Sequence, residues 1–386
     1  MDVYYFDNAA SSWPKPPGVA EAVGRAVADN GANPGRGGHR MAVDAGRSMF
    51  RTRAKLAKLF GVRNPNDIAF ALNTTAALNT AILGYVREGD HVVCTAVEHN
   101  SVRRPLEWLK ATKSVRVTYV ETDEDGTLDP MRVKESVEAG TRLIVVNHSS
   151  NLLGSIVPLQ EIGEIAKTRG AALLVDAAQS AGVLPIDVSA MGIDMLAFPG
   201  HKALYGPQGT GGLYISPHVE VEPIVFGGTG SQSEAVLQPT VRPDRYESGT
   251  QNAPGIAGLG AGLDFVLHET PANIHTKEWA LTQRMMEGLL RLDGVRILGP
   301  APGRARTGIV SFTAKGIDSA ELAFVLDQHF RIAVRAGFHC TPLAHRTAGT
   351  EQSGAVRASV GAFTTDEQVD YFLESMQQVV RSYRKE

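Results

Sequence analysis

Short runs of apolar, often β-branched residues recur along the first part of the chain, and turn-forming residues bound each run. They lie at 68–72, 91–96, 115–120, 142–147, 171–176, 194–198 and 211–215. Runs that are apolar at nearly every position are typical of strands buried on both faces of a sheet. We therefore expect these segments to be strands of one sheet.

Helical spacing appears between several of these runs. In 158–170, Leu159, Ile162 and Ile165 form an apolar stripe, and Gly170 can end the helix. Residues 42–61 predict a second helix, whose basic residues should face outward. The residues expected to face inward are Phe50, Leu56, Leu59 and Phe60. Strands that alternate with helices predict an α/β fold with a mostly parallel, doubly wound sheet.

The pattern changes after about residue 255. Helical spacing is found at 275–292, 319–330 and 366–384, and strand-like runs are found at 308–314 and 332–337. This order is typical of a smaller α+β domain that follows the large sheet.

Composition narrows the class of protein. The chain has 386 residues, 43% of them hydrophobic, and a net charge of −3, so we expect a sizeable core and neither nucleic acid nor a membrane as partner. Residues 1–17 lack the pattern of a secretory signal, and no run approaches the ~20 apolar residues that span a bilayer. Two cysteines cannot form a disulfide framework, which favours a reducing, cytoplasmic setting.

Polar residues at the ends of the predicted strands are candidates for a binding site, because ligands of such sheets collect there. Thr74 or Thr75 caps the helix after the first strand, or Thr75 binds a phosphate at its N-terminus. His99 is either structural or stacks on a planar ring and moves protons. Asp176 caps the next turn or pairs with a cation, since an unpaired buried carboxylate is costly.

Two further segments that follow predicted strands also contain candidate residues. Asn147, His148 and Asn151 either satisfy loop backbone or donate to a ligand oxygen. Lys202 lies among small, apolar and aromatic residues with glycines on both sides. An ammonium that is buried there loses solvation, so its pKa falls and the neutral amine becomes a nucleophile toward carbonyls.

Taken together, these side chains match the needs of pyridoxal 5'-phosphate (PLP). The cofactor requires an amine for a Schiff base, an acid at its ring nitrogen, a flat group over the ring, a donor to the ring oxygen and a phosphate cradle. In that order the candidates are Lys202, Asp176, His99, Gln179 and Thr75.

Motifs along nearly the whole chain carry a family resemblance. They include YFDNAASSWPKP (5–16), VDAAQSAG (175–182), GHKALYGPQGTGGLY (200–214), ESGTQNAPGIAGLGAGL (247–263), RAGFHCTPL (335–343) and VRASVGAF (356–363). On these motifs the chain resembles class V aminotransferases, and within them the cysteine desulfurases and selenocysteine lyases. The resemblance implies the type I fold of PLP-dependent transferases, with a large domain built on a mostly parallel mixed sheet and a smaller α+β domain.

The resemblance also implies a domain division and a set of roles. Residues 1–16 would pack on the small domain, 17–255 would form the PLP-binding domain, and 256–386 would form the small domain carrying Cys340 and Arg357. The cofactor-binding residues would be Lys202, Asp176, Gln179, His99, Thr75, Ala76, His201 and Asn151, completed by Gly249 and Thr250 of the neighbouring subunit in a homodimer. The substrate-binding residues would be Arg357, Asn151, Asn8, Ala9 and Arg335, with no metal. Arg357 would clamp the substrate carboxylate.

Cys340 would then be the sulfur acceptor. Its thiolate would attack the sulfur of L-cysteine to give a persulfide and L-alanine, and Arg335 and His339 would favour the thiolate. We expect Cys94, which lies inside a strand-like run, to be structural.

Two segments depart from many relatives. Phe338 precedes His339 where a second histidine is common, and Gly35 in 33–40 stands where some relatives carry histidine. Residues 226–234 are glycine-rich without the context of a dinucleotide site, and we interpret them as a mobile active-site loop.

The sequence therefore predicts a PLP-dependent cysteine desulfurase, with a protein as a further sulfur acceptor. The alternatives are a selenocysteine lyase, another class V aminotransferase or lyase, and a sulfur-relay binding protein without turnover.

Overall fold

All seven predicted strands form one sheet in the computed structural model, which describes residues 3–35 and 37–383. The strands are β2 (Ile68–Ala71), β3 (His91–Thr95), β4 (Arg116–Val120), β5 (Thr141–Asn147), β6 (Ala172–Asp176), β7 (Met195–Pro199) and β8 (Gly211–Ile215). Their order is β2-β8-β7-β6-β5-β3-β4, and β8 runs antiparallel to both of its neighbours while the other pairs are parallel. The predicted mixed, mostly parallel sheet is confirmed.

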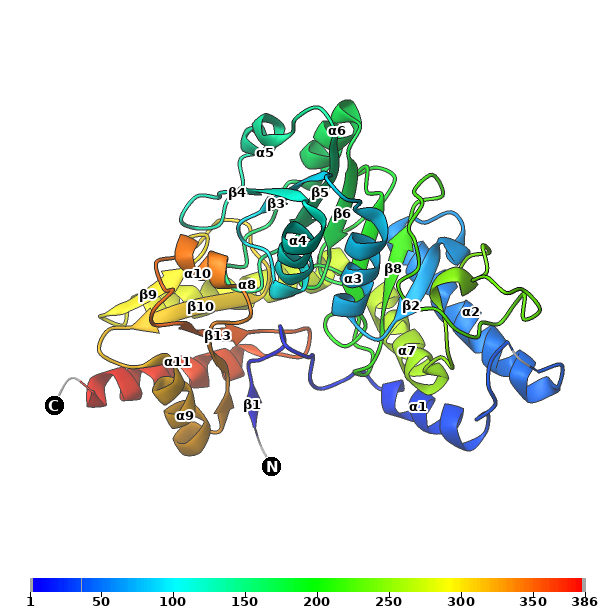
Figure 1. The fold of residues 1–386 in the computed structure, drawn as a ribbon. Coiled ribbons are helices and arrows are strands. Elements are labelled where there is room, and N and C mark those ends of the chain that lie inside the picture. The colour runs from blue at the N-terminus through cyan, green and yellow to red at the C-terminus, as the bar shows by residue number, and fades with distance from the viewer. Residues whose placement is uncertain (1–2, 36, 384–386) are drawn as a thin grey trace.

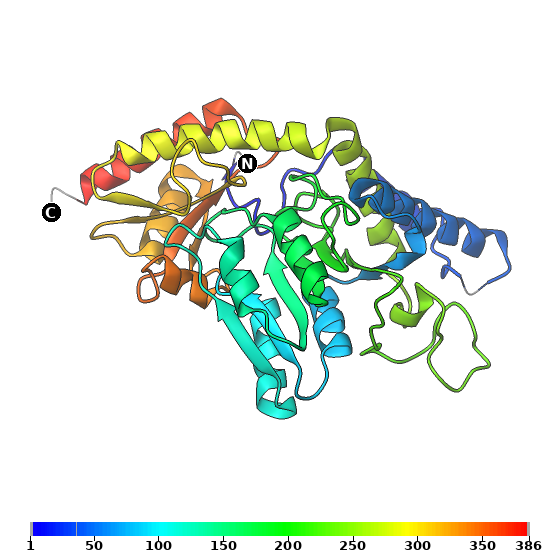
Figure 2. The same ribbon diagram turned by 90° about the horizontal axis from the view of Figure 1, so that it is seen from above.

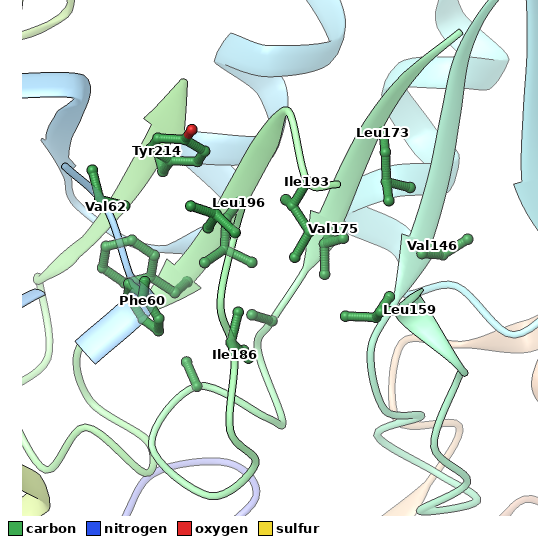
Figure 3. Close-up of a cluster of buried hydrophobic side chains, with 14 of the residues drawn as sticks. Phe60, Val62, Val146, Leu159, Leu173, Val175, Ile186, Ile193, Leu196 and Tyr214 are labelled. Carbon is green, nitrogen blue, oxygen red and sulfur yellow. The ribbon is translucent and has the colours of Figure 1, made fainter. Parts of the chain in front are cut away.

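Helices cover both faces of this sheet (Figure 1). One face packs on α3 (Thr74–Tyr85) and α4 (Asn100–Lys113). The other packs on α2 (Arg40–Phe60), α5 (Pro130–Ser136), α6 (Leu159–Arg169) and α7 (Ala253–Glu269). Figure 3 shows part of this second layer, in which Phe60 of α2 and Leu159 of α6 lie against Leu196, Val175 and Val146 of the sheet. Consecutive strand residues alternate between the two layers, so the strands are apolar at nearly every position.

The C-terminal part of the chain forms a second sheet, which packs against helices of its own. Strands β9 (Val295–Leu298), β10 (Ile309–Ala314), β12 (Arg335–Gly337) and β13 (Ala355–Ser359) make an antiparallel sheet in the order β12-β13-β10-β9. It packs against α8 (Pro271–Leu290), α9 (Ser319–Phe330) and α11 (Asp366–Ser382), and Figure 2 shows α8 running beside α11. The short α10 (Pro342–Thr347) follows β12.

The N-terminal strand β1 (Tyr4–Tyr5) pairs in parallel with β11 (Ile332–Ala333). Phe6 is buried in the core that α8, α9 and α11 share with the antiparallel sheet. The remaining elements are α1 (Val19–Ala28), η1 (Pro65–Asp67) and η2 (Asp244–Tyr246). The domain boundary at residue 255 stays a prediction; it falls inside α7, which packs on α1 and α2.

The prediction for 42–61 is wrong for two side chains. Phe50 is 52% exposed. The buried face of α2 contains Met49, Leu56 and Phe60, and Phe50 lies beside this face rather than on it. Arg53 does not face outward: it is 4% exposed and forms a buried ion pair with Glu247.

Other boundaries also differ from the sequence interpretation. Residues 332–337 are two strands in different sheets, β11 and β12. Helix α8 begins at Pro271 rather than 275, and α7 and β9 were not anticipated. The predicted helix 366–384 extends in the structure to Ser382, and residue 384 lies outside the described residues, as does residue 36 of the segment 33–40. Among the helices that the structure describes, none has the length and apolarity to cross a membrane.

Candidate active site

A cavity of about 220 Å³ opens at the carboxyl ends of β3, β5, β6 and β7. Most of the predicted site residues line it: Ala9, Thr75, His99, Asn151, Asp176, Gln179, His201, Lys202, Arg335 and Arg357. They come from both halves of the chain, since Arg335 lies on β12 and Arg357 on β13. Among its other lining residues, Asn147 ends β5 opposite Asp176 at the end of β6, as the strand-end rule requires.

Lys202 follows β7 and reaches this cavity. The pKa of its amine is lowered to about 8, chiefly by burial; Asp176 opposes the shift, and the nearby cations Arg357 and Arg335 add to it. The backbone N–H of Tyr205 donates to the Lys202 carbonyl, and Ser12 Oγ donates to the same oxygen. A lysine with this pKa has a substantial neutral fraction near pH 8, which is the form that attacks a carbonyl.

Asp176 is buried and its carboxylate is only partly satisfied. The backbone N–H of Ala178 donates to Oδ1 over 2.9 Å, and no other hydrogen bond reaches this carboxylate from the described residues. Burial raises the pKa of Asp176, while the Ala178 amide and Lys202 lower it. A cationic N–H in the cavity would supply the partner that this acid lacks.

Glu98 is a second buried acid at the same sheet edge, and sequence reasoning missed it. Its Oε1 accepts from the backbone N–H of Asn147 and from Thr95 Oγ1. Burial, with a smaller contribution from the charge of Asp176, raises its pKa to about 8. A pKa of about 8 favours the protonated form of Glu98 at neutral pH.

His99 stands at the N-terminus of α4. Its Nδ1 accepts from the backbone N–H of Ser101 over 3.1 Å, so the imidazole caps the helix. Burial, together with Lys202, Arg335 and other cations, lowers its pKa to about 4. The structural and functional interpretations of His99 are therefore compatible, because the capped ring also lines the cavity.

The N-terminus of α3 forms the polar end of the cavity. Asn73, rather than Thr74 or Thr75, caps the helix: its Oδ1 accepts from the Ala76 amide over 2.9 Å. Thr75 Oγ1 lies 2.7 Å from Ser101 Oγ. His201 adds a ring nitrogen, Nδ1, that is buried without a partner among the described residues, and burial lowers its pKa to about 4. Hydroxyls, first-turn amides and this imidazole are groups that hold a phosphate.

Arg357 is the charged group on the opposite side. Its side chain is 1% exposed, Nη2 donates to Asp7 Oδ1 over 2.9 Å, and Nη1 donates to the Asn151 carbonyl. Its Nε is buried without a partner. Such a held guanidinium is suited to a carboxylate.

Three predicted residues are tied to neighbouring backbone. Gln179 Nε2 donates to the Ala9 carbonyl, and the Ala9 amide donates to Ser359 Oγ. Asn8 Nδ2 donates to the Ser359 carbonyl, and Asn8 lines a small cavity behind Lys202 instead. Asn151 Nδ2 donates to the carbonyl of His339, so its amide supports the turn that carries Cys340.

Cys340 is exposed and lies on a tight turn between β12 and α10. It lines a groove that shares Thr75, His99 and Ser101 with the main cavity. Arg335 Nη2 lies 3.9 Å from its Sγ. Cys94, by contrast, is buried in β3, and burial raises the pKa of its thiol well above the usual value.

The prediction that His339 helps to form the thiolate is wrong. His339 is 2% exposed, and burial, with Arg357 and other neighbours, lowers its pKa to about 3, so the ring is neutral. A neutral ring cannot supply the positive charge that favours a thiolate.

Gly249 and Thr250 are exposed and do not line this cavity within one chain. Gly249 has φ 88°, and its N–H donates to the Gly228 carbonyl. Among the described residues, no cluster of three or more His, Cys, Asp or Glu side chains could hold a metal ion.

Comparison with known proteins places this geometry in a family. Residues 4–372 match the model "Aminotransferase class-V". A protein of Methanothermobacter thermautotrophicus named "Probable cysteine desulfurase" is 36% identical over 98% of this chain and 95% of its own length. One of the same name from Pyrococcus abyssi is also 36% identical, over 100% of this chain and 96% of its own length.

A solved structure agrees with these sequence matches. The cysteine desulfurase of Thermococcus onnurineus NA1, in its apo form, superposes with a TM-score of 0.93 at 35% identity, covering 98% of this chain and 95% of that one. The chain belongs to the class V aminotransferase family, whose members depend on PLP.

Proposed function

We propose that this protein is a PLP-dependent cysteine desulfurase that converts L-cysteine to L-alanine and stores the sulfur as a persulfide on Cys340. The observation that carries the proposal is the joining of two spaces at His99. An amine, an acid and a guanidinium line one space, and an exposed thiol lines the other. The names of the relatives support the same activity.

The residues of the cavity fit PLP. Asp176 offers a buried, incompletely paired carboxylate to a protonated ring nitrogen, and His201 Nδ1 is a buried atom that lacks a partner. Thr75 and the first turn of α3 would hold the phosphate, and Lys202 would hold the aldehyde. When bound, PLP withdraws electrons from the bonds of an attached amino acid.

The remaining steps belong to this chain's own residues. Arg357 would bind the substrate carboxylate, with Asn8, Ala9 and Arg335 shaping the site around it. His99, neutral at working pH, would accept and return a proton. The Cys340 thiolate would attack the substrate sulfur, so that an S–S bond forms as the C–S bond breaks, and the carbon would gain a proton to give alanine.

The setting of the enzyme is part of the proposal. We infer a cytoplasmic homodimer in which Gly249 and Thr250 of a second copy complete the phosphate site, and a protein that accepts the persulfide sulfur. Two free cysteines among the described residues and no membrane-spanning helix in them support a reducing, water-exposed setting.

Exposure to L-cysteine followed by mass analysis tests the activity. We expect one added sulfur on the peptide that contains Cys340, and alanine and sulfide when a thiol reductant is present. The variant Cys340→Ser should lose both the added sulfur and the release of alanine and sulfide, whereas Cys94→Ser should keep them. Full cysteine turnover by Cys340→Ser would contradict the persulfide role, and cleavage of selenocysteine alone would favour a selenocysteine lyase.

A further inference from the structure

The turn that carries Cys340 is held in an unfavourable backbone conformation. His339 and Cys340 have φ angles of 50° and 59°, in the left-handed region that non-glycine residues rarely adopt. Residues in this conformation are strained and persist only where the surroundings hold them. The hydrogen bonds that hold this turn therefore determine where the thiol points.

Backbone bonds fix the turn on the side of the cofactor cavity. The Asn100 amide donates to the Cys340 carbonyl over 2.8 Å. Thr341 Oγ1 donates to the Glu98 carbonyl, and Asn151 Nδ2 donates to the His339 carbonyl. These bonds hold the main chain, but none of them holds the ring of His339.

His345, on α10, holds that ring from the other side. The two imidazoles are stacked, with centroids 5.7 Å apart and planes 17° apart, and His345 is completely buried. His339 Nδ1 lies 3.5 Å from His345 Nε2, and His345 Nδ1 lies 2.8 Å from Thr350 Oγ1. His339 Nε2 lies 3.4 Å from the carbonyl of Arg335.

One assignment of protons gives every ring nitrogen of His339 and His345 a hydrogen-bond partner. The Thr350 hydroxyl donates to His345 Nδ1, His345 Nε2–H donates to His339 Nδ1, and His339 Nε2–H donates to the Arg335 carbonyl. The His339 ring must then be neutral, because a second proton on its Nδ1 would face the Nε2–H of His345. Burial lowers the pKa of His345 to about 4 and that of His339 to about 3, in agreement with this assignment.

We infer that His345 is a positioning residue for Cys340: through His339 it holds the strained turn and the backbone of Arg335, and so keeps the Arg335 guanidinium beside the thiol. This inference deepens the proposed function and rests on it for the role of Cys340. The 3.9 Å separation of Arg335 Nη2 from Sγ is the contact that the chain of bonds preserves.

Substitutions of His345 separate hydrogen bonding from packing. His345→Gln keeps an N–H that can donate to His339 Nδ1, whereas His345→Phe keeps a ring but cannot donate. His345→Phe leaves the buried His339 Nδ1 without its donor, so we expect it to slow alkylation of Cys340 by iodoacetamide about tenfold. His345→Gln should stay within about threefold of the unaltered protein. His329→Phe, at an exposed histidine of α9, is the matched control and should have no effect.

Two readouts distinguish failure of this inference from failure of the proposed function. Alkylation is measured on the Cys340 peptide, with the buried Cys94 as internal reference, and needs neither cofactor nor turnover. In the loaded enzyme, sulfur transfer to Cys340 in a single turnover should fall with alkylation, while the colour change on binding L-cysteine stays the same. Absence of a persulfide in the unaltered protein would refute the proposed function but leave the alkylation result meaningful.

Equal alkylation of His345→Phe and the unaltered protein would overturn the inference. So would equal losses in His345→Gln and His345→Phe, since packing alone would then explain them. If His345→Phe does not fold, Thr350→Val decides the question. This variant removes the hydroxyl that donates to His345 Nδ1 and should slow alkylation of Cys340 about threefold. An unchanged rate would overturn the inference.

Discussion

Lys202 combines two properties that seldom occur in one lysine: a position at the end of an apolar strand and a pKa lowered to about 8 by burial and neighbouring cations. Desolvation is the largest cause, and Asp176 limits the shift by stabilising the charged form. The residue is thereby ready to react with an aldehyde under ordinary conditions.

The rate at which the cofactor-free protein takes up PLP should follow this ionisation. Because the pKa is lowered, the reactive neutral amine accumulates as the pH rises through about 8 rather than about 10.5. Stopped-flow absorbance measured from pH 6 to 10 should show a rate that increases to about pH 8 and then levels off. A rate that keeps climbing tenfold per pH unit beyond pH 9 would contradict the lowered pKa.

At this scale the sequence predicted the residues that end apolar strands. Asp176 and His99 were found because a polar side chain at the carboxyl end of a buried strand has few structural roles. Glu98 and His345 were not, since the importance of each depends on a contact that the fold creates, with Asn147 for Glu98 and with His339 for His345. The neutral state of His339 likewise follows from burial, which no local pattern indicated.

Helix α7 shows why the elements were harder to predict than the strand ends. Its sequence, APGIAGLGAGLDFVLHE, is rich in glycine, which is usually a helix breaker. A side chain at Gly262 would place its Cβ 2.4 Å from the Leu204 carbonyl, and one at Gly260 would meet Thr52 at 2.5 Å. The glycines therefore allow close packing on the lysine-bearing loop and on α2, which only the tertiary structure reveals.

The ion pair of Arg53 and Glu247 joins α2 to the segment before α7. Arg53 Nη1 lies 2.6 Å from Glu247 Oε1 and also donates to the Ile68 carbonyl, and the Phe70 amide donates to the same carboxylate oxygen. Arg53→Ala would leave a buried carboxylate without its cation, so we expect a loss of about 3–5 kcal/mol in the free energy of unfolding.

The matched control is Arg25→Ala, which removes an exposed pair with Glu21 at 2.9 Å and should cost about 0–1 kcal/mol. Urea unfolding of the unaltered protein, Arg53→Ala and Arg25→Ala measures the differences in the free energy of unfolding. Similar losses in the two variants would show that burial of the Arg53 pair does not matter to stability.

On the scale of the whole molecule, the antiparallel C-terminal sheet delivers Arg335 and Arg357 to a cavity that the large sheet opens. Exposed apolar side chains remain on the segment before η2, among them Phe226 at 70% and Leu237 at 81%. Large apolar side chains left this exposed are candidates for a surface that another protein covers. The proposed second copy would cover it and bring Gly249 and Thr250 to the phosphate site.

Hybrid dimers test that arrangement. Lys202→Ala removes the reactive amine, and Thr250→Asp places a negative charge where the phosphate is expected, so each variant alone should be inactive. When the two chains are mixed, one site has Lys202 from the second variant and Thr250 from the first, and activity should return to about half that of an unaltered dimer, scaled by the fraction of hybrids. No recovery in hybrids verified by native mass spectrometry would mean that Thr250 acts within its own chain or not at all.

The family and the fold were the parts of the whole molecule that the sequence could predict, because the motifs extend along nearly the entire chain and the comparisons confirm both. The way in which α2 buries Arg53 and exposes Phe50 could not be predicted, since both depend on which neighbour covers each side of the helix.

The central claim is that the amine of Lys202 binds the aldehyde of PLP while Asp176 holds the ring nitrogen. Borohydride reduction of the protein loaded with PLP, followed by peptide mass analysis, tests it most directly. The account predicts a permanent pyridoxyl addition on the peptide that contains Lys202 and on no other lysine peptide. A reduced cofactor that washes away, or that stays on a different lysine, would contradict it.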